Sequence, residues 1–293
     1  MKKNIAIFGL GSMGFGIAKS CIDNGHKVWG FDISRRTINK FKKIGGVIDT
    51  FDKIAKNLDM VFLVVLNAKQ VKNIFTKDPG ILKILPKEKL VINCVTNSPK
   101  DAENFYNLCK KNNIQYLDSP ISGGAKKAMH SKITIMASGS EKSFKKANEV
   151  FKDISEKVYN LGLKPGSGSA MKAVNQLLAG VHIAAMAEAL NFAKAQDIDI
   201  KQCVEIISKS AGNSWMFQNR SQNIISNDFS PKSALDIWPK DLGIVDKIAR
   251  ELNLYAPIVK TALKEYKLAS KNGLGSLDDS ILIKHYFNKN KTI

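Results

Sequence analysis

The feature that most constrains the fold lies in the first 32 residues, where a glycine motif stands between two apolar runs. Residues 4–10, NIAIFGL, and residues 27–32, KVWGFD, are both predicted to be buried strands. The motif fits the pattern G-x-G-x-x-G and opens a predicted helix over residues 12–24. A strand, a glycine turn and a helix in this order indicate a dinucleotide site.

Each glycine of the motif has its own task in such a site. Gly9 permits the tight turn, Gly11 lets backbone N–H groups approach a pyrophosphate, and Gly14 lets helix and strand pack closely. Asp32 ends the second strand, and its carboxylate would bind a ribose 2′-hydroxyl and repel a 2′-phosphate. We therefore expect NAD as the cofactor. The expected contacts from the motif are Gly9, Leu10, Gly11, Ser12, Met13 and Gly14.

Arg35 and Arg36 leave one alternative open, because they directly follow this region and would favour NADP if they faced a 2′-phosphate. A solvated helix start is the other interpretation of the pair.

The two halves of the chain differ in their periodicity. The first half continues with apolar runs that alternate with helical stretches, which predicts an α/β fold with a doubly wound parallel sheet. These runs are residues 60–66, 90–95, 115–118 and 132–138. The second half shows helical spacing only, and glycines and Pro165 cluster over residues 162–166. We expect a nucleotide-binding domain over residues 1–163 and an all-helical domain over residues 164–293.

The net charge of +19 says little about nucleic acid, because the basic residues are nearly all lysines scattered along the chain. We expect no nucleic-acid partner, and a positive field that attracts small anionic substrates. The longest apolar run has seven residues, so we expect no membrane partner. The four cysteines and four histidines form no metal-binding pattern, which predicts free thiols, a cytoplasmic location and no bound metal.

The segment GSGSAMKAVNQ, residues 166–176, is the main candidate for chemistry in the second half. Lys172 falls in the first turn of a long predicted helix, and Asn175 and Gln176 follow on the same face. The positive end of the helix dipole disfavours a charged lysine, and a neutral lysine can act as a general base. A solvated lysine remains the alternative.

Two other segments combine polar groups with turn residues. In DSPISGG, Ser122 and the N–H groups of Gly123 and Gly124 would form a nest for a carboxylate, or else an ordinary turn. In WPKDLG, Lys240 and Asp241 open a helix, either as functional groups or as an exposed cap.

Taken together, the glycine motif with Asp32, DSPISGG, GSGSAMKAVNQ and PKDLG resemble the β-hydroxyacid dehydrogenases in order and spacing. That family includes 3-hydroxyisobutyrate dehydrogenase and tartronate semialdehyde reductase. The resemblance implies a Rossmann-type domain followed by an all-helical domain, with Lys172 as the catalytic residue. It implies substrate binding by Ser122, Gly123, Gly124, Asn175, Gln176 and Asp241, and further cofactor binding by Leu66, Asn67, Thr96 and Lys240.

One departure narrows the expected substrate. Most of the family carries asparagine where this chain has Gln176, and the surrounding sequence looks like the branch that oxidises L-threonate. We expect NAD-dependent oxidation of L-threonate to 2-dehydro-L-erythronate, with 3-hydroxyisobutyrate dehydrogenase and tartronate semialdehyde reductase as the alternative activities. A non-catalytic nucleotide- or nucleic-acid-binding protein is a more distant alternative. The long helix after Ser169 is apolar around much of its circumference, which predicts a homodimer or homotetramer.

Overall fold

The computed structural model describes residues 2–77 and 79–289, and the chain forms two compact units. The first unit is Met1–Lys172 and the second is Ala173–Ile293. The division falls inside helix α9 (Ser167–Ala195), which begins in the first unit and continues in the second. A domain boundary between residues 163 and 164 stays a prediction.

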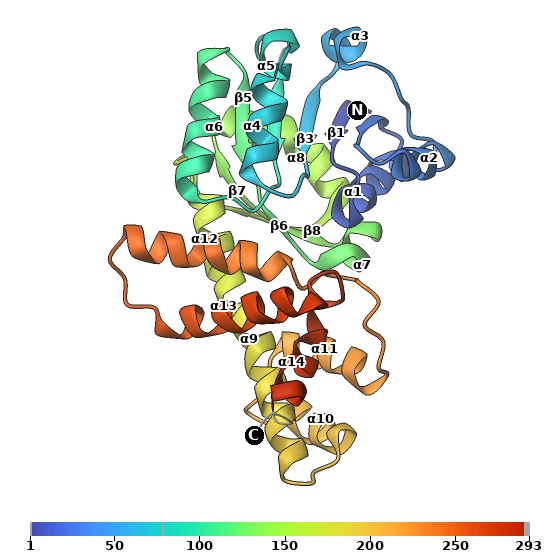
Figure 1. Ribbon diagram of the computed structural model, residues 1–293. Coiled ribbons are helices and arrows are strands. Elements are labelled where there is room, and N and C mark those ends of the chain that lie inside the picture. Colours follow the sequence, from blue (N-terminus) through green and yellow to red (C-terminus); the bar gives the residue numbers. More distant parts are fainter. Residues whose placement is uncertain (1, 78, 290–293) are drawn as a thin grey trace. The chain divides into compact units, whose positions relative to one another are not determined.

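The first unit contains a mixed sheet in which parallel pairs predominate (Figure 1). Its strands are β1 (Asn4–Phe8), β2 (Lys27–Phe31), β3 (Met60–Leu63), β4 (Leu90–Asn93), β5 (Gln115–Asp118), β6 (Ile121–Ser122), β7 (Ile133–Gly139) and β8 (Ser155–Asn160). The order is β2-β1-β3-β4-β5-β7-β6, and β8 pairs with β7. Strands β1 to β5 are parallel, as Ile5 opposite both Val28 and Met60 illustrates. The predicted Rossmann-type α/β fold is confirmed.

The sheet is not wholly parallel, because β7 runs antiparallel to β5 and to β6. Only a short segment with the six-residue helix α7 (Gly124–Met129) joins β6 to β7. Such short connections suit antiparallel neighbours, whereas parallel neighbours need a longer crossover.

Helices cover both faces of this sheet, because its central strands β3 and β4 are buried at every position. Residues Ile5 and Ile7 of β1 face one core, and Ala6 between them faces the other. The first core is closed by α1 (Ser12–Asp23) and α8 (Glu141–Ile154), and the second by α4 (Ala68–Thr76) and α6 (Pro99–Lys111). The shorter helices are α2 (Arg35–Lys43), α3 (Phe51–Ile54), η1 (Ala55–Asn57) and α5 (Ile81–Ile84).

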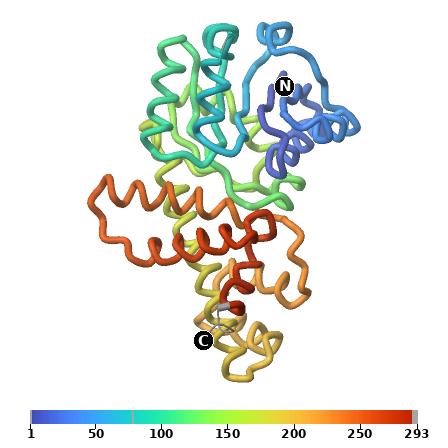
Figure 2. Tube along the Cα trace, in the orientation of Figure 1, coloured from blue at the N-terminus to red at the C-terminus, as the bar shows by residue number. Residues whose placement is uncertain are grey.

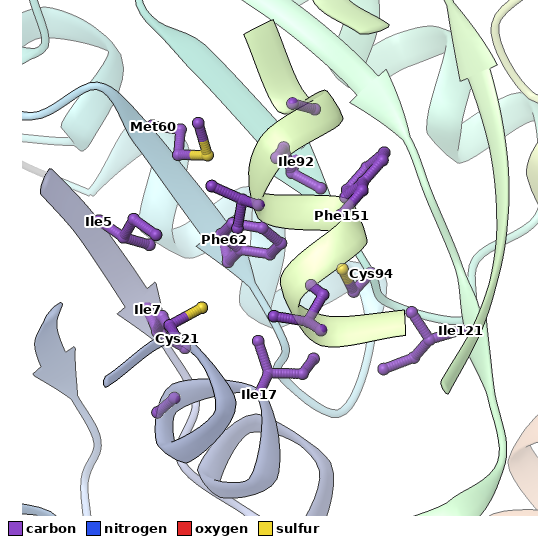
Figure 3. Close-up of a cluster of buried hydrophobic side chains, with 14 of the residues drawn as sticks. Ile5, Ile7, Ile17, Cys21, Met60, Phe62, Ile92, Cys94, Ile121 and Phe151 are labelled. Carbon is purple, nitrogen blue, oxygen red and sulfur yellow. The ribbon is translucent and has the colours of Figure 1, made fainter. Parts of the chain in front are cut away.

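Figure 3 shows the first of these cores, where Ile17 and Cys21 of α1 and Phe151 of α8 surround Phe62 of β3. Cys21, Cys94 and Cys109 are buried free thiols, and burial raises the pKa of each well above its ordinary value. These three thiols therefore stay protonated at neutral pH and serve as small apolar side chains.

The second unit is helical throughout the residues that the structure describes. It contains the rest of α9, α10 (Ile200–Ser208), α11 (Trp215–Ile225), α12 (Ile237–Glu251), α13 (Pro257–Ala269), η2 (Ser270–Leu274), η3 (Asp279–Ile281) and α14 (Leu282–Lys289). Helices α12 and α13 lie side by side (Figure 2). The hydroxyl of Tyr266 in α13 donates to the carbonyl oxygen of Gly180 in α9 (2.9 Å).

Helix α9 forms the centre of this helical core, where Ile183, Met186 and Leu190 are at most 1% exposed. By length and mean hydropathy, α9 is also the one helix among the described residues that is long and apolar enough to cross a membrane. The core helix of a protein that does not enter a membrane has the same properties, so this feature is weak evidence for a membrane span.

Candidate functional site

The glycine motif adopts the tight geometry expected of a dinucleotide turn. Gly9 has a φ of +90°, and a Cβ there would lie 2.5 Å from the carbonyl oxygen of Val64. A Cβ on Gly14 would lie 1.9 Å from the carbonyl oxygen of Gly9, so these two positions admit only glycine. A Cβ on Gly11, in contrast, would meet no atom within 4 Å. The turn is therefore packed tightly against the protein at Gly9 and Gly14, whereas the space beside Gly11 is free for a ligand.

Asp32 lies beside this turn with its carboxylate held in place. Its Oδ2 accepts from the N–H of Leu10 (2.7 Å) and its Oδ1 from the N–H of Ser34 (2.8 Å). These two bonds fix a negative charge at the end of β2, where a ribose would lie, so the chain's residues fit NAD. Arg35 and Arg36 are exposed at the start of α2, as a solvated helix start requires.

The other predicted cofactor residues follow the neighbouring strands β3 and β4. Leu66 is 56% exposed, and its N–H donates to the Gln70 side chain (2.8 Å). Asn67 caps α4 by accepting from the N–H of Gln70 (3.0 Å), and Thr96 follows β4. Since β1, β3 and β4 are adjacent and parallel, these segments gather at the carboxyl edge of the sheet, where doubly wound sheets bind ligands.

Two polar side chains at this same edge were missed by sequence reasoning. Asn97 is 1% exposed, and neither atom of its amide has a hydrogen-bond partner. The Ser119 hydroxyl after β5 is likewise buried and unpartnered. Burying such a group without a partner costs about 1–3 kcal/mol, so both side chains are candidates to contact a ligand at this edge. A single amide in a loop carries no pattern that would have revealed it.

The segment DSPISGG forms β6 and the start of α7. Gly123 and Gly124 have φ values of +128° and +72°, which favour glycine, and a Cβ on Gly124 would meet no atom within 4 Å. Helix α7 packs closely on α1, since a Cβ on Gly16 would lie 2.6 Å from the Cβ of Ala128. The Ser122 segment is thus anchored to the helix that the glycine motif opens.

Lys172 lies one turn into α9 and is only 6% exposed. The solvated alternative is therefore wrong. The start of α9 is bound to the sheet: the Asp118 carboxylate accepts from the N–H (2.8 Å) and the hydroxyl (2.7 Å) of Ser169. The N–H of Gly168 donates to the Ser138 hydroxyl (3.1 Å). Lys172 consequently belongs to the same compact unit as the glycine motif and the Ser122 segment.

Four predicted residues come together in the second unit. The Gln176 amide donates to Asp241 Oδ2 (2.5 Å) and accepts from the Asn175 amide (2.9 Å), while Lys240 forms an ion pair with Asp241. Gln176 is 7% exposed and Asp241 is 3% exposed, so the exposed-cap interpretation of Asp241 is wrong. Sequence reasoning placed these residues in one site but did not foresee the direct bond between Gln176 and Asp241.

A buried network holds the first turn of α12, which carries Lys240 and Asp241. The indole N–H of Trp238 donates to Asp279 Oδ2 (3.0 Å), and Arg220 Nε donates to Asp279 Oδ1 (2.6 Å). Because both of its oxygens are paired, the fully buried Asp279 carboxylate can hold the first turn of α12 in place.

No group of three or more His, Cys, Asp or Glu side chains that could hold a metal occurs in residues 2–77 and 79–289. The chemistry that these residues offer is anion binding and proton transfer beside a dinucleotide.

Comparisons with known proteins agree with this geometry. Residues 4–162 match the family model described as the NAD binding domain of 6-phosphogluconate dehydrogenase. Residues 166–286 match the model described as NAD-binding of NADP-dependent 3-hydroxyisobutyrate dehydrogenase.

Similar proteins match over nearly their whole length. An L-threonate dehydrogenase of Pectobacterium atrosepticum is 42% identical, with 96% of this chain and 93% of that protein covered. An L-threonate dehydrogenase of Escherichia coli K12 is 39% identical, with 96% and 94% covered. The crystal structure of a 3-hydroxyisobutyrate dehydrogenase from Salmonella typhimurium is 37% identical, covers 97% of this chain and 99% of its own, and superimposes with a TM-score of 0.90.

Proposed function

The chain belongs to the β-hydroxyacid dehydrogenase family, in the group that includes 3-hydroxyisobutyrate dehydrogenase, and we propose that it oxidises L-threonate at C2 to 2-dehydro-L-erythronate. As a member of this family it is an NAD-dependent oxidoreductase. The observation that carries the proposal is the burial of Lys172 in the unit that contains the glycine motif. The choice of L-threonate is supported by relatives of that name at 38–42% identity and by Gln176.

The proposed mechanism begins with binding of the substrate carboxylate. We propose that Ser122 donates through its hydroxyl and that Gly123 and Gly124, both at positive φ, donate through their backbone N–H groups. The lysines of the chain give a positive field that favours an anionic substrate.

Lys172 then accepts the proton of the C2 hydroxyl through its Nζ atom, as a general base. Bound NAD supplies the acceptor for the hydride that leaves C2. The motif glycines, Asp32, Leu66, Asn67, Thr96 and Lys240 are proposed to hold the cofactor. In the reverse direction, Lys172 returns the proton to the carbonyl oxygen.

Asn175 and Gln176 are proposed to orient the remaining hydroxyl groups. The Gln176 amide nitrogen carries two hydrogens, and its bond to Asp241 uses one. The second is available to a hydroxyl oxygen of the substrate. The Asn175 amide similarly keeps its oxygen and one hydrogen after donating to Gln176.

The test of this proposal is Lys172→Ala assayed with NAD and L-threonate. We expect turnover to fall by about 10²–10⁴-fold, the usual contribution of a general base, with NADH affinity unchanged. Undiminished turnover would remove Lys172 from this role. A panel of L-threonate and 3-hydroxyisobutyrate with NAD, and of tartronate semialdehyde with NADH, tests the substrate through the rise or fall of NADH absorbance, since a structural neighbour is named 3-hydroxyisobutyrate dehydrogenase.

We further propose a cytoplasmic homodimer or homotetramer. Met171, Val174 and Leu178 recur at helical spacing along α9 and are 42%, 52% and 49% exposed. A second copy of the chain would cover this apolar stripe. Free buried thiols support a reducing compartment.

A further inference from the structure

Asp118 is a fully buried carboxylate to which the proposed mechanism gives no task. We propose that Asp118 is the positioning residue for Lys172, and that it acts through Ser169 at the start of α9. This inference rests on the proposed function, because it takes Lys172 as the proton acceptor.

The first step of the argument is the geometry of the carboxylate. Asp118 ends β5, and each of its two oxygens accepts one hydrogen bond from Ser169: Oδ2 from the N–H (2.8 Å) and Oδ1 from the hydroxyl (2.7 Å). Both residues are 0% exposed, so water does not compete for these bonds. Two charge-assisted bonds to one residue fix both the position and the rotation of the helix start.

The second step is the tightness of the surrounding backbone. A Cβ on Gly168 would lie 2.5 Å from the carbonyl oxygen of Met136 and 2.7 Å from that of Asp118. The helix start therefore contacts β7 and β5 directly, and the Gly168 N–H is bound to Ser138 of β7. The first turn of α9 is thus joined to the sheet both by hydrogen bonds and by direct backbone contact.

The third step connects this anchor to the amine. Lys172 lies three residues after Ser169 and four after Gly168, which is one helical turn. A turn is stiff, so a shift of its start moves Lys172 by a similar distance. A misplacement of about 1 Å at a reacting group can cost about 100-fold in rate.

The ionisation of Asp118 gives this arrangement a distinctive pH dependence. Burial raises the pKa of Asp118 to about 6, although the bonds from Ser169 and Ser138 oppose the increase. Above that pH both oxygens accept. Below it one oxygen carries a hydrogen, and the pair of bonds from Ser169 is weakened.

The titratable neighbours of Asp118 are Cys94, directly after β4, and Tyr116 on β5, and Lys172 follows one turn along α9. Burial raises the pKa of both Cys94 and Tyr116, so they stay neutral near pH 6. In the direction of carbonyl reduction, Lys172 is the proton donor and must be protonated. A fall in pH therefore does not remove its active form. A loss of kcat below about pH 6 in that direction therefore reports Asp118.

The experiment compares Ser169→Ala with Ser280→Ala. Each variant removes one buried hydroxyl that donates to a buried aspartate, since Ser280 donates to Asp278 (2.6 Å) in the second unit. We expect Ser169→Ala to lower kcat about tenfold, because a shift of Lys172 by a fraction of 1 Å costs less than the roughly 100-fold of a full 1 Å, while KM for the hydroxy acid and Kd for NADH change less than about twofold. Ser280→Ala keeps the wild-type kcat, and Ser169→Thr, which retains the hydroxyl, restores most of the loss.

A second variant, Asp118→Asn, tests the pH dependence. We expect a lowered kcat and no decline near pH 6 in the direction of reduction. Equal kcat values for Ser169→Ala and Ser280→Ala, or a decline near pH 6 that persists in Asp118→Asn, would overturn the inference. Lys172→Ala separates the two proposals: if it abolishes turnover while Ser169→Ala behaves as Ser280→Ala does, only the positioning role fails.

Discussion

The hydrogen bond between Gln176 and Asp241 allows a sharp test of what stabilises the helical unit, because removing one methylene group from Gln176 breaks it. In Gln176→Asn the amide stays but moves back along the side chain by roughly one C–C bond, about 1.5 Å. The present distance to Asp241 Oδ2 is 2.5 Å, so the new distance of roughly 4 Å lies beyond hydrogen-bond range. The change keeps the charge and the chemical type of both partners.

The expected cost follows from the burial of the acceptor. Asp241 is 3% exposed, so little water replaces the lost donor, and the ion pair with Lys240 remains. A hydrogen bond to a charged group contributes about 1.5–3 kcal/mol. We therefore expect the free energy of unfolding to fall by about 2 kcal/mol, which corresponds to about 4–8 °C in Tm for a chain of this size.

The assay is denaturant and thermal unfolding, with Gln222→Asn as the matched control. Gln222 is an exposed residue of α11, so the same shortening there should leave stability within about 0.5 kcal/mol. A double-mutant cycle with Asp241→Asn isolates the pairwise contribution. The reasoning is refuted if Gln176→Asn is no less stable than Gln222→Asn, or if the effects of Gln176→Asn and Asp241→Asn simply add.

Three other predictions follow from the geometry. Gly11→Ala should keep the wild-type Tm and weaken NADH binding at least about tenfold, since its Cβ meets no protein atom but faces the ligand, whereas Gly14→Ala should lower Tm as well. Equal Tm values for the two variants would contradict this, as measured by unfolding and NADH fluorescence titration. Asp32→Ala removes the charge that repels a 2′-phosphate, so the ratio of kcat/KM for NADP to that for NAD should rise about tenfold or more, and an unchanged ratio would disprove it. Leu178→Glu places a charge in the exposed stripe of α9 and should convert the proposed oligomer to a smaller species in light scattering, whereas an unaltered mass would contradict an interface at this stripe.

Much of the first unit could be predicted from the sequence, because the signals there are local. The glycine motif between two apolar runs indicated β1, α1 and β2, and further short, mainly apolar runs indicated buried strands. The reversal of β7 could not be predicted in this way, since a parallel and an antiparallel strand share the same alternation. Strand β8 was missed for another reason: most of its side chains are exposed, so it lacks an apolar face.

In the candidate site, too, features with a local sequence pattern could be predicted and bonds between distant residues could not. Gly9 and Gly14 were identified because a glycine turn has a local pattern, and the structure supplies the close contacts that demand glycine there. The bonds of Asp118 to Ser169 and of Gln176 to Asp241 join residues that are far apart in the sequence, so no spacing encodes them. Such bonds form only when distant segments of the chain fold together, so a local sequence pattern does not reveal them.

The division of α9 has a consequence for how substrate choice can change in this family. Lys172 ends the unit that contains the sheet, and Gln176 lies one turn later in the helical unit. The start of α9 is held by Asp118 and Ser138, whereas its later turns are held by the core around Ile183.

The proposed proton acceptor is thus fixed by the same unit as the glycine motif and all the other proposed cofactor residues except Lys240, and hydroxyl recognition is assigned to the helical unit. Substitutions at Asn175 and Gln176 should therefore alter KM and the preferred hydroxy acid while NADH affinity stays constant. If substitutions at Gln176 altered NADH affinity as strongly as KM for the hydroxy acid, this separation of tasks would be wrong.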